Sequence, residues 1–345
     1  MEHPSTPRPH AHVTMQDVAE KAGVSAQTVS NVVNGRTERV SAETIDRVAR
    51  VIDDLGYRLN QSARSLRKGR TGIVGLGVPI LASEYYGELA ERLSQRFSAR
   101  GIRLVTENTG GVMTAEIESL AASHLETYDG FILAIAASES ADLGRIPPAK
   151  PIVLLGERAL ATRFDHVLMD NVAGGRLATG HLLDRGARSV IALGGSATGI
   201  ESMQTLRTQG YLAAHRERGL PVRSELIVAS GLDMTDGFRA VTTLIDEGAR
   251  FDGVFALTDS SAFGALRALA DRGIRVPADV QVVGFDNVRA AAHVVPRLTT
   301  VEPGNDAMAD EIVAIMLARL QTEGASGPPL RSMTPPRLVV RETTR

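Results

Sequence analysis

The stretch TMQDVAEKAGVSAQTVSNVVNGRTERVSAETIDRVARVIDDLGYRLNQSARSL, residues 14–66, decides how the chain begins to fold. Thr14 and Asp17 have the spacing of a capping box at the start of a short helix, which Gly23 ends. Ser25 offers a second N-cap, and the helix behind it runs to an Asn-Gly stop signal. The two helices can share a core through their small apolar side chains, which are Val18, Ala22, Val29, Val32 and Val33.

The second of these helices leaves its small or polar side chains outside that core, namely Ala26, Gln27, Ser30 and Asn31. Two helices joined by a glycine-containing turn, with such a face on the second helix, are typical of a helix-turn-helix that fits the major groove of DNA. A third helix is predicted from Ser41 to Leu55, because an apolar stripe runs along it and Gly56 follows. The sequence therefore predicts a DNA-binding domain over residues 13–59.

Charge is distributed unevenly along the chain, although the formal net charge is only −2. Residues 1–71 carry 11 Lys and Arg against 8 Asp and Glu, whereas the remainder carries 27 against 32. Residues 56–71 hold five basic residues and no acidic one. Such a run can be a solvated surface, but behind a helix-turn-helix it favours contact with DNA phosphates, because binding releases counterions. We expect residues 60–71 to be a hinge helix and linker that orders against DNA or a second copy of the chain.

The composition is that of a globular protein of more than one domain, with 345 residues and 43% hydrophobic residues. The absence of cysteine excludes disulfides and thiolate metal sites, and it fits a reducing cytoplasm. No apolar run reaches the length of a membrane span, so no membrane association is expected. The Pro- and His-rich residues 1–12 lack the apolar core of a signal peptide and are expected to form a disordered tail. We therefore expect a cytoplasmic protein with no metal site and no cofactor.

From Gly72 onward, short apolar runs alternate with longer amphipathic stretches. The apolar runs cover residues 73–78, 102–105, 130–135, 151–156, 189–195, 225–229, 252–257 and 280–285. This alternation is typical of βαβ units, whose parallel sheets are covered by helices on both faces. Because so many units exceed one ordinary open sheet, we expect an α/β core of two doubly wound parallel-sheet subdomains with a cleft between them. Ligands of such sheets bind outside the carboxyl ends of the strands.

Catalytic motifs do not emerge from the core sequence. Gly75-Leu76-Gly77 lacks the third glycine of a dinucleotide-binding fingerprint, and residues 194–199 lack the Gly-Lys-Ser/Thr ending of a phosphate loop. His181 lies in a helical stretch without a Ser or Cys nucleophile beside it. We therefore do not expect an enzyme. A solute-binding protein without a DNA role is the other alternative, which the helix-turn-helix and the missing signal peptide oppose.

Several segments resemble the lac repressor/purine repressor (LacI/GalR) family of bacterial transcription regulators. The resemblance begins with DVAEKAGVSAQTVSNVVNG (17–35), VSAETIDRVARVIDDLGY (40–57) and NQSARSL (60–66), and continues through VPILASEYYGELA, HVLMDNVAGG, RTQGYLAA, ALTDSSAFGALRAL, VVGFDN and LTTVEP. It implies a dimer with a periplasmic-binding-protein-like core, in which a small molecule in the cleft controls binding to operator DNA. One subdomain is then expected at 72–171 with about 301–327, and the other at 172–300 with about 328–345.

The resemblance makes the second helix the one that reads DNA bases. Gln27 and Asn31 are four residues apart and so share a face, from which amide side chains can pair with adenine. Ala26 can meet a thymine methyl group. The alternative is that the two amides contact only phosphates or water. The family often has Arg where this chain has Asn31, so we expect an unusual operator sequence.

Other residues of the DNA-binding domain and hinge match positions that contact the DNA backbone or the minor groove in the family. The backbone-contacting set is Thr14, Ser25, Thr28, Ser30, Asn34, Arg39, Ser41 and Tyr57, of which Ser25 and Ser41 can also be helix caps. Leu66 corresponds to a hinge leucine that wedges into the minor groove, with Ala63 beside it and Asn60 at the start of the hinge. The alternative for Leu66 is packing under the core. Leu59 replaces a common Pro, so the entry to this hinge is expected to be less rigid.

In the core, Arg207 and Asp286 match the two polar residues that anchor the effector in the family. A guanidinium and a carboxylate can hold adjacent hydroxyl groups or a carboxylate of a ligand, although the two could also form a purely structural ion pair. The other residues expected to bind effector are Tyr85, Tyr86, Asp170, Thr258 and Asp259. The two aspartates of that set can also serve as helix caps.

The nature of the effector is less sharply indicated than its site. A carbohydrate is the commonest effector class of the family, and we expect one here. However, Thr258 stands where Asn is common, Leu232 where others have an aromatic platform, and Met203 where a small polar residue is frequent. A nucleobase or another small metabolite is therefore the alternative. The C-terminal stretch lacks a leucine heptad repeat, so we expect a homodimer rather than a tetramer.

Overall fold

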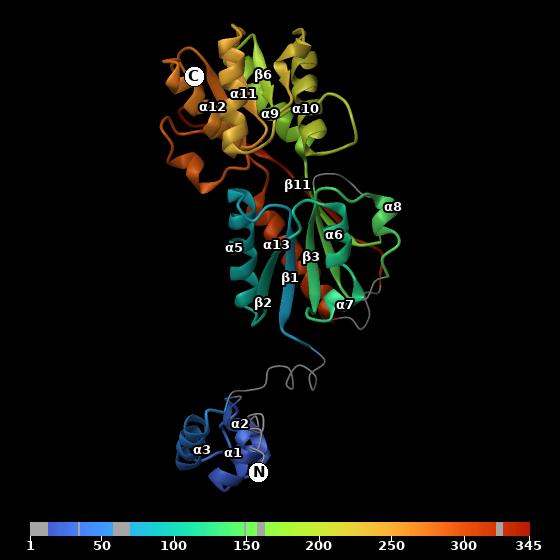
Figure 1. Ribbon diagram of the computed structural model, residues 1–345, viewed down its shortest axis with the longest axis vertical. Coiled ribbons are helices and arrows are strands. Elements are labelled where there is room, and N and C mark those ends of the chain that lie inside the picture. Colours follow the sequence, from blue (N-terminus) through green and yellow to red (C-terminus); the bar gives the residue numbers. More distant parts are fainter. Residues whose placement is uncertain (1–12, 34, 58–69, 148–149, 157–162, 322–326) are drawn as a thin grey trace, which may run out of the picture. The chain divides into compact units, whose positions relative to one another are not determined.

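The computed structural model describes residues 13–33, 35–57, 70–147, 150–156, 163–321 and 327–345. The chain forms two compact units, Met1–Thr71 and Gly72–Arg345 (Figure 1). The first unit contains the helices α1 (Met15–Ala22), α2 (Ala26–Val33) and α3 (Ala42–Leu55). Within the part of the chain that is described, no helix has both the length and the hydropathy needed to cross a bilayer.

The predicted caps of the first unit are present. Thr14 and Asp17 form a capping box at the start of α1, and Gly23 ends that helix with a φ of 64°. The Ser25 hydroxyl accepts a hydrogen bond from the Thr28 amide, which caps α2. Ser41 caps α3, which ends at Gly56. The three helices enclose a small core whose buried members are Val18, Ala19, Ala22, Val29, Val48 and Val51.

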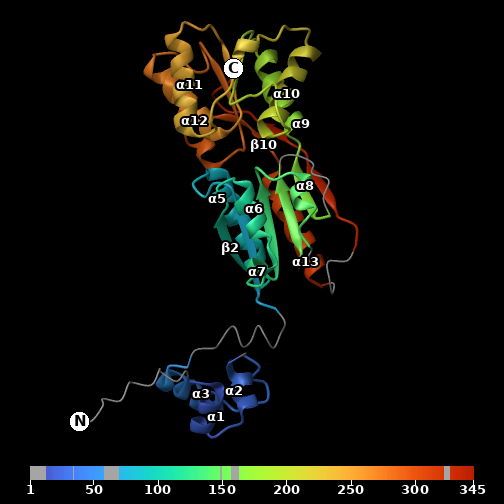
Figure 2. The same cartoon turned by 45° about the vertical axis from the view of Figure 1, so that its right-hand side comes forward.

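The first subdomain of the second unit is built on a six-stranded parallel sheet. Its strands are β1 (Ile73–Val78), β2 (Arg103–Asn108), β3 (Gly130–Ile135), β4 (Ile152–Gly156), β5 (Asp165–Met169) and β11 (Arg331–Thr334), in the order β11-β5-β4-β3-β1-β2. Its helices are α5 (Glu84–Ser98), α6 (Met113–Ser119), α7 (Ala122–Leu125), α8 (Ser140–Leu143) and α13 (Asn305–Gln321). Helices α5 and α13 pack against each other on one face, and α6 and α7 lie over the other (Figures 1 and 2).

The second subdomain repeats this plan with a second six-stranded sheet. Its strands are β6 (Val190–Leu193), β7 (Ile227–Val228), β8 (Gly253–Ala256), β9 (Gln281–Phe285), β10 (Thr299–Glu302) and β12 (Arg337–Val339), in the order β12-β10-β9-β8-β6-β7. All neighbours are parallel except β12, which runs antiparallel to β10. The helical elements are α9 (Asn171–Asp184), α10 (Met203–Glu217), η1 (Ser224–Leu226), α11 (Met234–Asp246), α12 (Asp259–Asp271) and η2 (Arg289–Ala292).

Burial on both faces explains why the strands are continuous apolar runs. In β3, Ile132 and Ala134 pack toward the core that contains α5 and α13. The alternate residues Phe131 and Leu133 pack into the separate cluster under α6 and α7. Both faces of the strand are therefore apolar. The predicted fold class of two parallel-sheet α/β subdomains is confirmed.

The last crossings between the subdomains differ from the expected boundaries. The sequence placed residues from about 301 in the first subdomain and residues from about 328 in the second. In the structure β10, which ends at Glu302, pairs with β9 of the second sheet, and β11 pairs with β5 of the first. The chain therefore crosses at 303–304 and again at 335–336. The sequence missed the second crossing because β11 has no apolar pattern of its own and is specified by its pairing with the distant strand β5.

Candidate functional site

The outward face of α2 carries the two amides that the sequence singled out. Gln27 is exposed and Asn31 is half-buried. The Gln27 Nε2 donates a hydrogen bond to the Asn31 Oδ1 at 3.1 Å, so the two side chains do lie on one face. Together they present amide donors and acceptors in adjacent positions, which is the chemistry that pairs with adenine edges in a major groove.

The expectation that Ser30 lies on that outward face is wrong. Ser30 is only 5% exposed and belongs to the buried side of α2, next to Val29 of the small core. Ala26 is half-buried and packs against the same core. The physical reason is that a three-helix domain of this size buries a wide arc of each helix, so the face left for DNA is narrower than the sequence suggested.

The remaining predicted contacts of this domain surround the ends of its helices. Thr14 and Ser41 are exposed N-caps, Arg39 is exposed in the loop before α3, and Tyr57 packs against the core after α3. The hydroxyls of Ser25 and Thr28 are hydrogen bonded to each other at 2.9 Å. Four further predicted contacts lie outside the described residues, namely Asn34, Asn60, Ala63 and Leu66.

In the core, Arg207 lies where the carboxyl ends of the two sheets meet. Its side chain is 1% exposed, and its guanidinium stacks on the Phe285 ring, with 3.5 Å between the guanidinium carbon and the ring centroid. Nε donates to the Asn171 Oδ1 at 2.8 Å, and Nη1 donates to the Leu257 carbonyl directly after β8. Nη2 faces the thioether of Met169, at the end of β5 in the first sheet. The guanidinium is thus positioned from both subdomains at once.

Asp286, directly after β9, approaches the same guanidinium. Its Oδ1 lies 3.6 Å from Arg207 Nη1, and the residue is 7% exposed. The backbone of Asp286 has a φ of 113°, which is rare for a residue with a side chain. The two residues that the family resemblance singled out are therefore neighbours in the structure. The pair combines donors and acceptors at the strand ends where α/β folds bind ligands.

Asp259 is near this pair but is engaged in the fold itself. It is fully buried, accepts hydrogen bonds from the Val288 amide at 2.9 Å and from the Thr300 hydroxyl at 2.5 Å, and lies at the start of α12. Burial, and then the charge of Asp286, raise the pKa of Asp259 well above its usual value. A carboxyl with these two donors ties the loop after β9 and the strand β10 to the start of α12.

The helix-cap alternative holds for one aspartate and not for the other. Asp170 is the N-cap of α9 and accepts a hydrogen bond from the Ala173 amide at 2.9 Å. The N-cap of α12 is Thr258 rather than Asp259, through a capping box with Ser261. Thr258 also donates to the Leu232 carbonyl at 2.7 Å. Its hydroxyl therefore joins the loops after β7 and β8.

Tyr85 and Tyr86 open α5 on the first subdomain's side. Their rings meet edge to face, with centroids 5.0 Å apart, and Tyr85 packs against apolar residues of both subdomains. One helical turn later, the Glu88 Oε1 accepts a hydrogen bond from the Arg289 amide of η2 at 2.6 Å. The Arg289 Nη2 donates to the Glu91 Oε2 at 2.8 Å. The start of α5 therefore touches the segment that follows Asp286.

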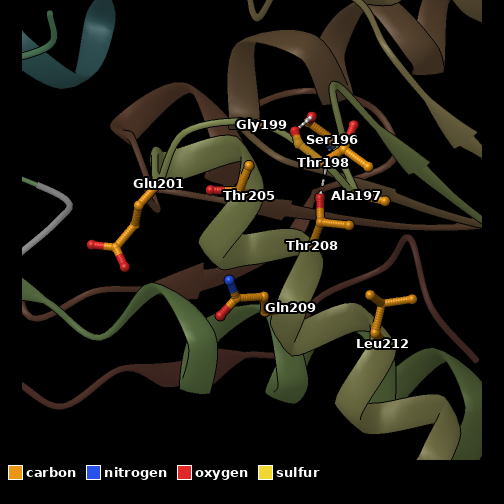
Figure 3. A pocket seen from close by; sticks show the side chains of 9 residues that line it. All are labelled: Ser196, Ala197, Thr198, Gly199, Glu201, Thr205, Thr208, Gln209 and Leu212. Carbon is orange, nitrogen blue, oxygen red and sulfur yellow. Dashed lines mark hydrogen bonds between the residues drawn. The ribbon is translucent and has the colours of Figure 1, made fainter.

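A separate hollow of about 150 Å³ lies between α10 and the loop after β6 (Figure 3). Thr208 and Gln209 line it from the helix, and Ser196 and Thr198 line it from the loop after β6. The Thr208 hydroxyl accepts a hydrogen bond from the Ser196 amide at 3.0 Å. None of the seven residues predicted to bind effector lines this hollow.

Two buried polar residues at the carboxyl ends of the sheets were missed in the sequence. Asn171 is 2% exposed and positions Arg207, and a signal was present because it follows the cap Asp170. Glu116 is fully buried and accepts hydrogen bonds from the amides of Ala136 and Ser138 at 2.8 and 2.7 Å. It fixes the loop after β3 at the carboxyl edge of the first sheet. Nothing in the local sequence distinguishes Glu116 from a surface glutamate on an amphipathic helix.

Comparisons with known proteins agree with this architecture. Residues 14–60 match the model of the bacterial regulatory proteins of the lacI family, and residues 179–344 match the periplasmic binding protein-like domain. The HTH-type transcriptional regulator DegA of Bacillus subtilis (strain 168) is 31% identical over 342 residues, covering 96% of this chain and 98% of DegA.

Two solved structures are similar to this chain over nearly its whole length. A CelR–cellobiose complex is 30% identical with a TM-score of 0.66, covering 97% of this chain and all of that one. The lac repressor dimer bound to operator and the anti-inducer ONPF is 25% identical with a TM-score of 0.79, covering 97% and 99%. The chain therefore belongs to the lacI family of bacterial regulatory proteins, and it is a helix-turn-helix transcriptional regulator.

Proposed function

We propose that this regulator is a repressor that binds a pseudo-palindromic operator as a homodimer. Its affinity for the operator rises or falls when a carbohydrate binds in the core cleft. The observation that carries the proposal is the buried Arg207/Asp286 pair at the meeting carboxyl ends of two sheets, on the same chain as a helix-turn-helix. A ligand there contacts both subdomains. It can therefore favour one of their orientations by differential binding.

Operator recognition is assigned to the exposed face of α2. Gln27 and Asn31 supply the base-reading amides, and Ala26 lies at the start of the same helix. Thr14, Ser25, Thr28, Arg39, Ser41 and Tyr57 are assigned to the DNA backbone together with Asn34. Asn60, Ala63 and Leu66 are assigned to a hinge that enters the minor groove. The lac repressor relative is described as a dimer on its operator, which supports two headpieces on one site.

The effector is assigned to the Arg207/Asp286 pair, with Tyr85 and Tyr86 as the wall contributed by α5. Donors and acceptors side by side suit the adjacent hydroxyl groups of a sugar. The CelR relative is described with bound cellobiose, which supports this class. Asp170, Thr258 and Asp259 hold helix ends and loops around the same cleft, and we assign them to shaping it. A DNA-binding regulator of this kind acts in the cytoplasm, without a catalytic step.

The experiment is calorimetry on the full chain with D-cellobiose, D-ribose and hypoxanthine, followed by operator binding in the presence of whichever compound binds. We expect a sugar to bind, to change operator affinity, and to lose its effect in Arg207→Ala. Binding of hypoxanthine alone would replace the sugar with a nucleobase, and unchanged sugar affinity in Arg207→Ala would remove that residue from the site. For the hinge, Leu66→Ala should lower both operator affinity and DNA bending, and no change in either would contradict the wedge.

A further inference from the structure

The crossing from β10 to α13 is hydrogen bonded to the turn that carries Asp286. The Asn305 Nδ2 donates to the Asp286 carbonyl at 2.8 Å. The Asn287 Nδ2 donates to the Glu302 Oε2 at 2.7 Å, and the other oxygen of Glu302 accepts from the amides of Gly304 and Asn305. The segment that connects the subdomains is thus hydrogen bonded to Asp286 through Asn305 and to the neighbouring Asn287 through Glu302.

The turn needs such support because of its backbone conformation. Asp286 and Asn287 have φ values of 113° and 51°, in the left-handed region that side-chain-bearing residues seldom occupy. Such conformations persist where the surroundings hold them, and they concentrate at ligand sites and switches. The Asp286 amide donates to the Val301 carbonyl at 2.9 Å, and Arg341 donates to the Asn287 Oδ1 at 2.6 Å. Asn305 adds a hydrogen bond to the Asp286 carbonyl.

Asn305 differs from the other supports because it belongs to the opposite subdomain. It is the first residue of α13, which packs against α5, β4 and β5 of the first subdomain. Asp286 follows β9 of the second sheet. The bond between them therefore crosses from one subdomain to the other. Asn305 is 4% exposed, and its Oδ1 has no hydrogen-bond partner among the described residues, so the side chain is kept in place despite an unsatisfied buried acceptor.

We propose that Asn305 is a positioning residue that couples the orientation of the two subdomains to the Asp286 effector anchor. This inference rests on the proposed function, since it takes Asp286 as an effector residue. When α13 moves with the first subdomain, the Asn305 side chain changes its hold on the strained turn and so moves the Asp286 carboxylate. Conversely, a ligand that fixes Asp286 favours the orientation in which the Asn305 bond is made.

The test measures subdomain orientation directly, without an effector. The chain has no cysteine, so spin labels can be attached through Glu118→Cys in the first subdomain and Glu247→Cys in the second, both exposed positions. Inter-label distances are measured by pulsed electron resonance on the full chain, diluted with unlabelled protein. The variants are Asn305→Leu and Asn305→Asp, which have similar shapes and lack the amide donor. The matched control is Asp306→Ala, which breaks exposed ion pairs to Arg92 and Arg96 within the first subdomain.

We expect both Asn305 variants to raise the population of the minor orientation roughly fivefold, the change that the loss of one net hydrogen bond produces. The control should keep the parent distribution. Asn305→Leu also leaves the Asp286 carbonyl without its donor, so the inter-label distances, rather than the unfolding midpoint, separate the coupling from a purely structural role. Distance distributions that coincide with the parent in both variants would overturn the coupling. If the distances shift while no sugar binds, the coupling stands and the effector class is what failed.

Discussion

Arg207 Nη1 and Asp286 Oδ1 lie 3.6 Å apart, and Arg207 is only 1% exposed. The two residues are 79 positions apart in the sequence. The Arg207 guanidinium also contacts Asn171, the Leu257 carbonyl and the Phe285 ring. A buried charge with this many partners is pre-oriented before any ligand arrives. The same partners also make it part of the structural core.

Replacing Arg207 with lysine should destabilise the core as well as abolish effector binding. An ammonium cannot reach Asn171, the Leu257 carbonyl and Asp286 together, so buried partners lose their donors. We expect a loss of about 3–5 kcal/mol in the free energy of unfolding, the usual cost of breaking a buried pair from one side. Urea denaturation measures it, with Arg216→Lys on the exposed side of α10 as the control. Equal stability of the two variants would show that the guanidinium contacts contribute little.

Gly175 should tolerate no side chain, and the same holds for Gly210 across the α9–α10 contact. A Cβ built there would lie 2.2 Å from the Arg207 carbonyl oxygen, which belongs to the backbone and cannot move aside like a side chain. Gly175→Ala should therefore force the helices apart, with a cost of about 3 kcal/mol, and displace Arg207 with them. Gly87→Ala is the matched control, because that exposed helical site has nothing within 4 Å.

The control should gain about 0.5–1 kcal/mol, since alanine is the better helix former. Thermal unfolding of the two variants gives the comparison. A Gly175→Ala variant as stable as the parent would mean that the close helix approach has room to relax.

Much of the fold follows from the sequence, and the exceptions have a common cause. The strands at 73–78 and 130–135 match the predicted runs residue for residue, because a strand buried on both faces is apolar throughout. β5 was not among the predicted strands. It begins with Asp165 and His166, and the Asp165 carboxylate is buried against Arg319, which donates to it at 2.7 and 2.8 Å. Arg319 lies 154 residues from Asp165 in the sequence, so the two side chains meet only in the folded chain.

Part of the candidate site could likewise be predicted from the sequence, and part could not. The resemblance brought Arg207 and Asp286 together, and the spacing of Gln27 and Asn31 placed them on one helix face. The burial of Ser30 was not foreseen, because the width of the buried arc depends on where α1 and α3 pack rather than on α2 itself. Contacts such as the Asn305 amide on the Asp286 carbonyl involve backbone atoms, which carry no sequence signal at all.

His166 should make the core less stable in acid. Burial, and then the charge of Arg331, lower the pKa of His166 to about 4 from 6.5. The unfolded chain therefore takes up a proton near pH 6.5 that the folded chain resists until about pH 4. The free energy of unfolding should fall across this window by about 3 kcal/mol, and the contribution is fully present only above pH 6.5.

His166→Leu isolates this effect, because the other histidines stay in both proteins. Urea unfolding at pH 7.5 and pH 4.5 should show a smaller acid loss in the variant than in the parent. The ring nitrogens of His166 have no hydrogen-bond partner among the described residues, so the variant should be no less stable at neutral pH. Identical pH dependence in the two proteins would contradict a depressed pKa.

The Arg289 contacts with α5 should respond to salt. Arg289 is 71% exposed in its side chain and Glu91 is 48% exposed, so their attraction is screened by solvent and ions. A double-mutant cycle with Arg289→Ala and Glu91→Ala should give a coupling below about 1 kcal/mol at low salt and less at high salt. The hydrogen bond from the Arg289 amide to Glu88 uses the backbone and survives both substitutions. A coupling that is larger and independent of salt would point to a contact shielded from solvent.

Selection of bound DNA from a random library by the full-length protein, repeated with Gln27→Ala/Asn31→Ala, tests whether a dimer reads its operator through these two amides. We predict an enriched sequence with two inverted half-sites, and about 1–3 kcal/mol less discrimination at the half-site positions read by each lost amide. The double variant should keep the half-site spacing, because spacing is set by the dimer and the DNA-backbone contacts. Enrichment of a single, non-repeated site, or an identical sequence preference in the double variant, would contradict the dimeric operator-reading model.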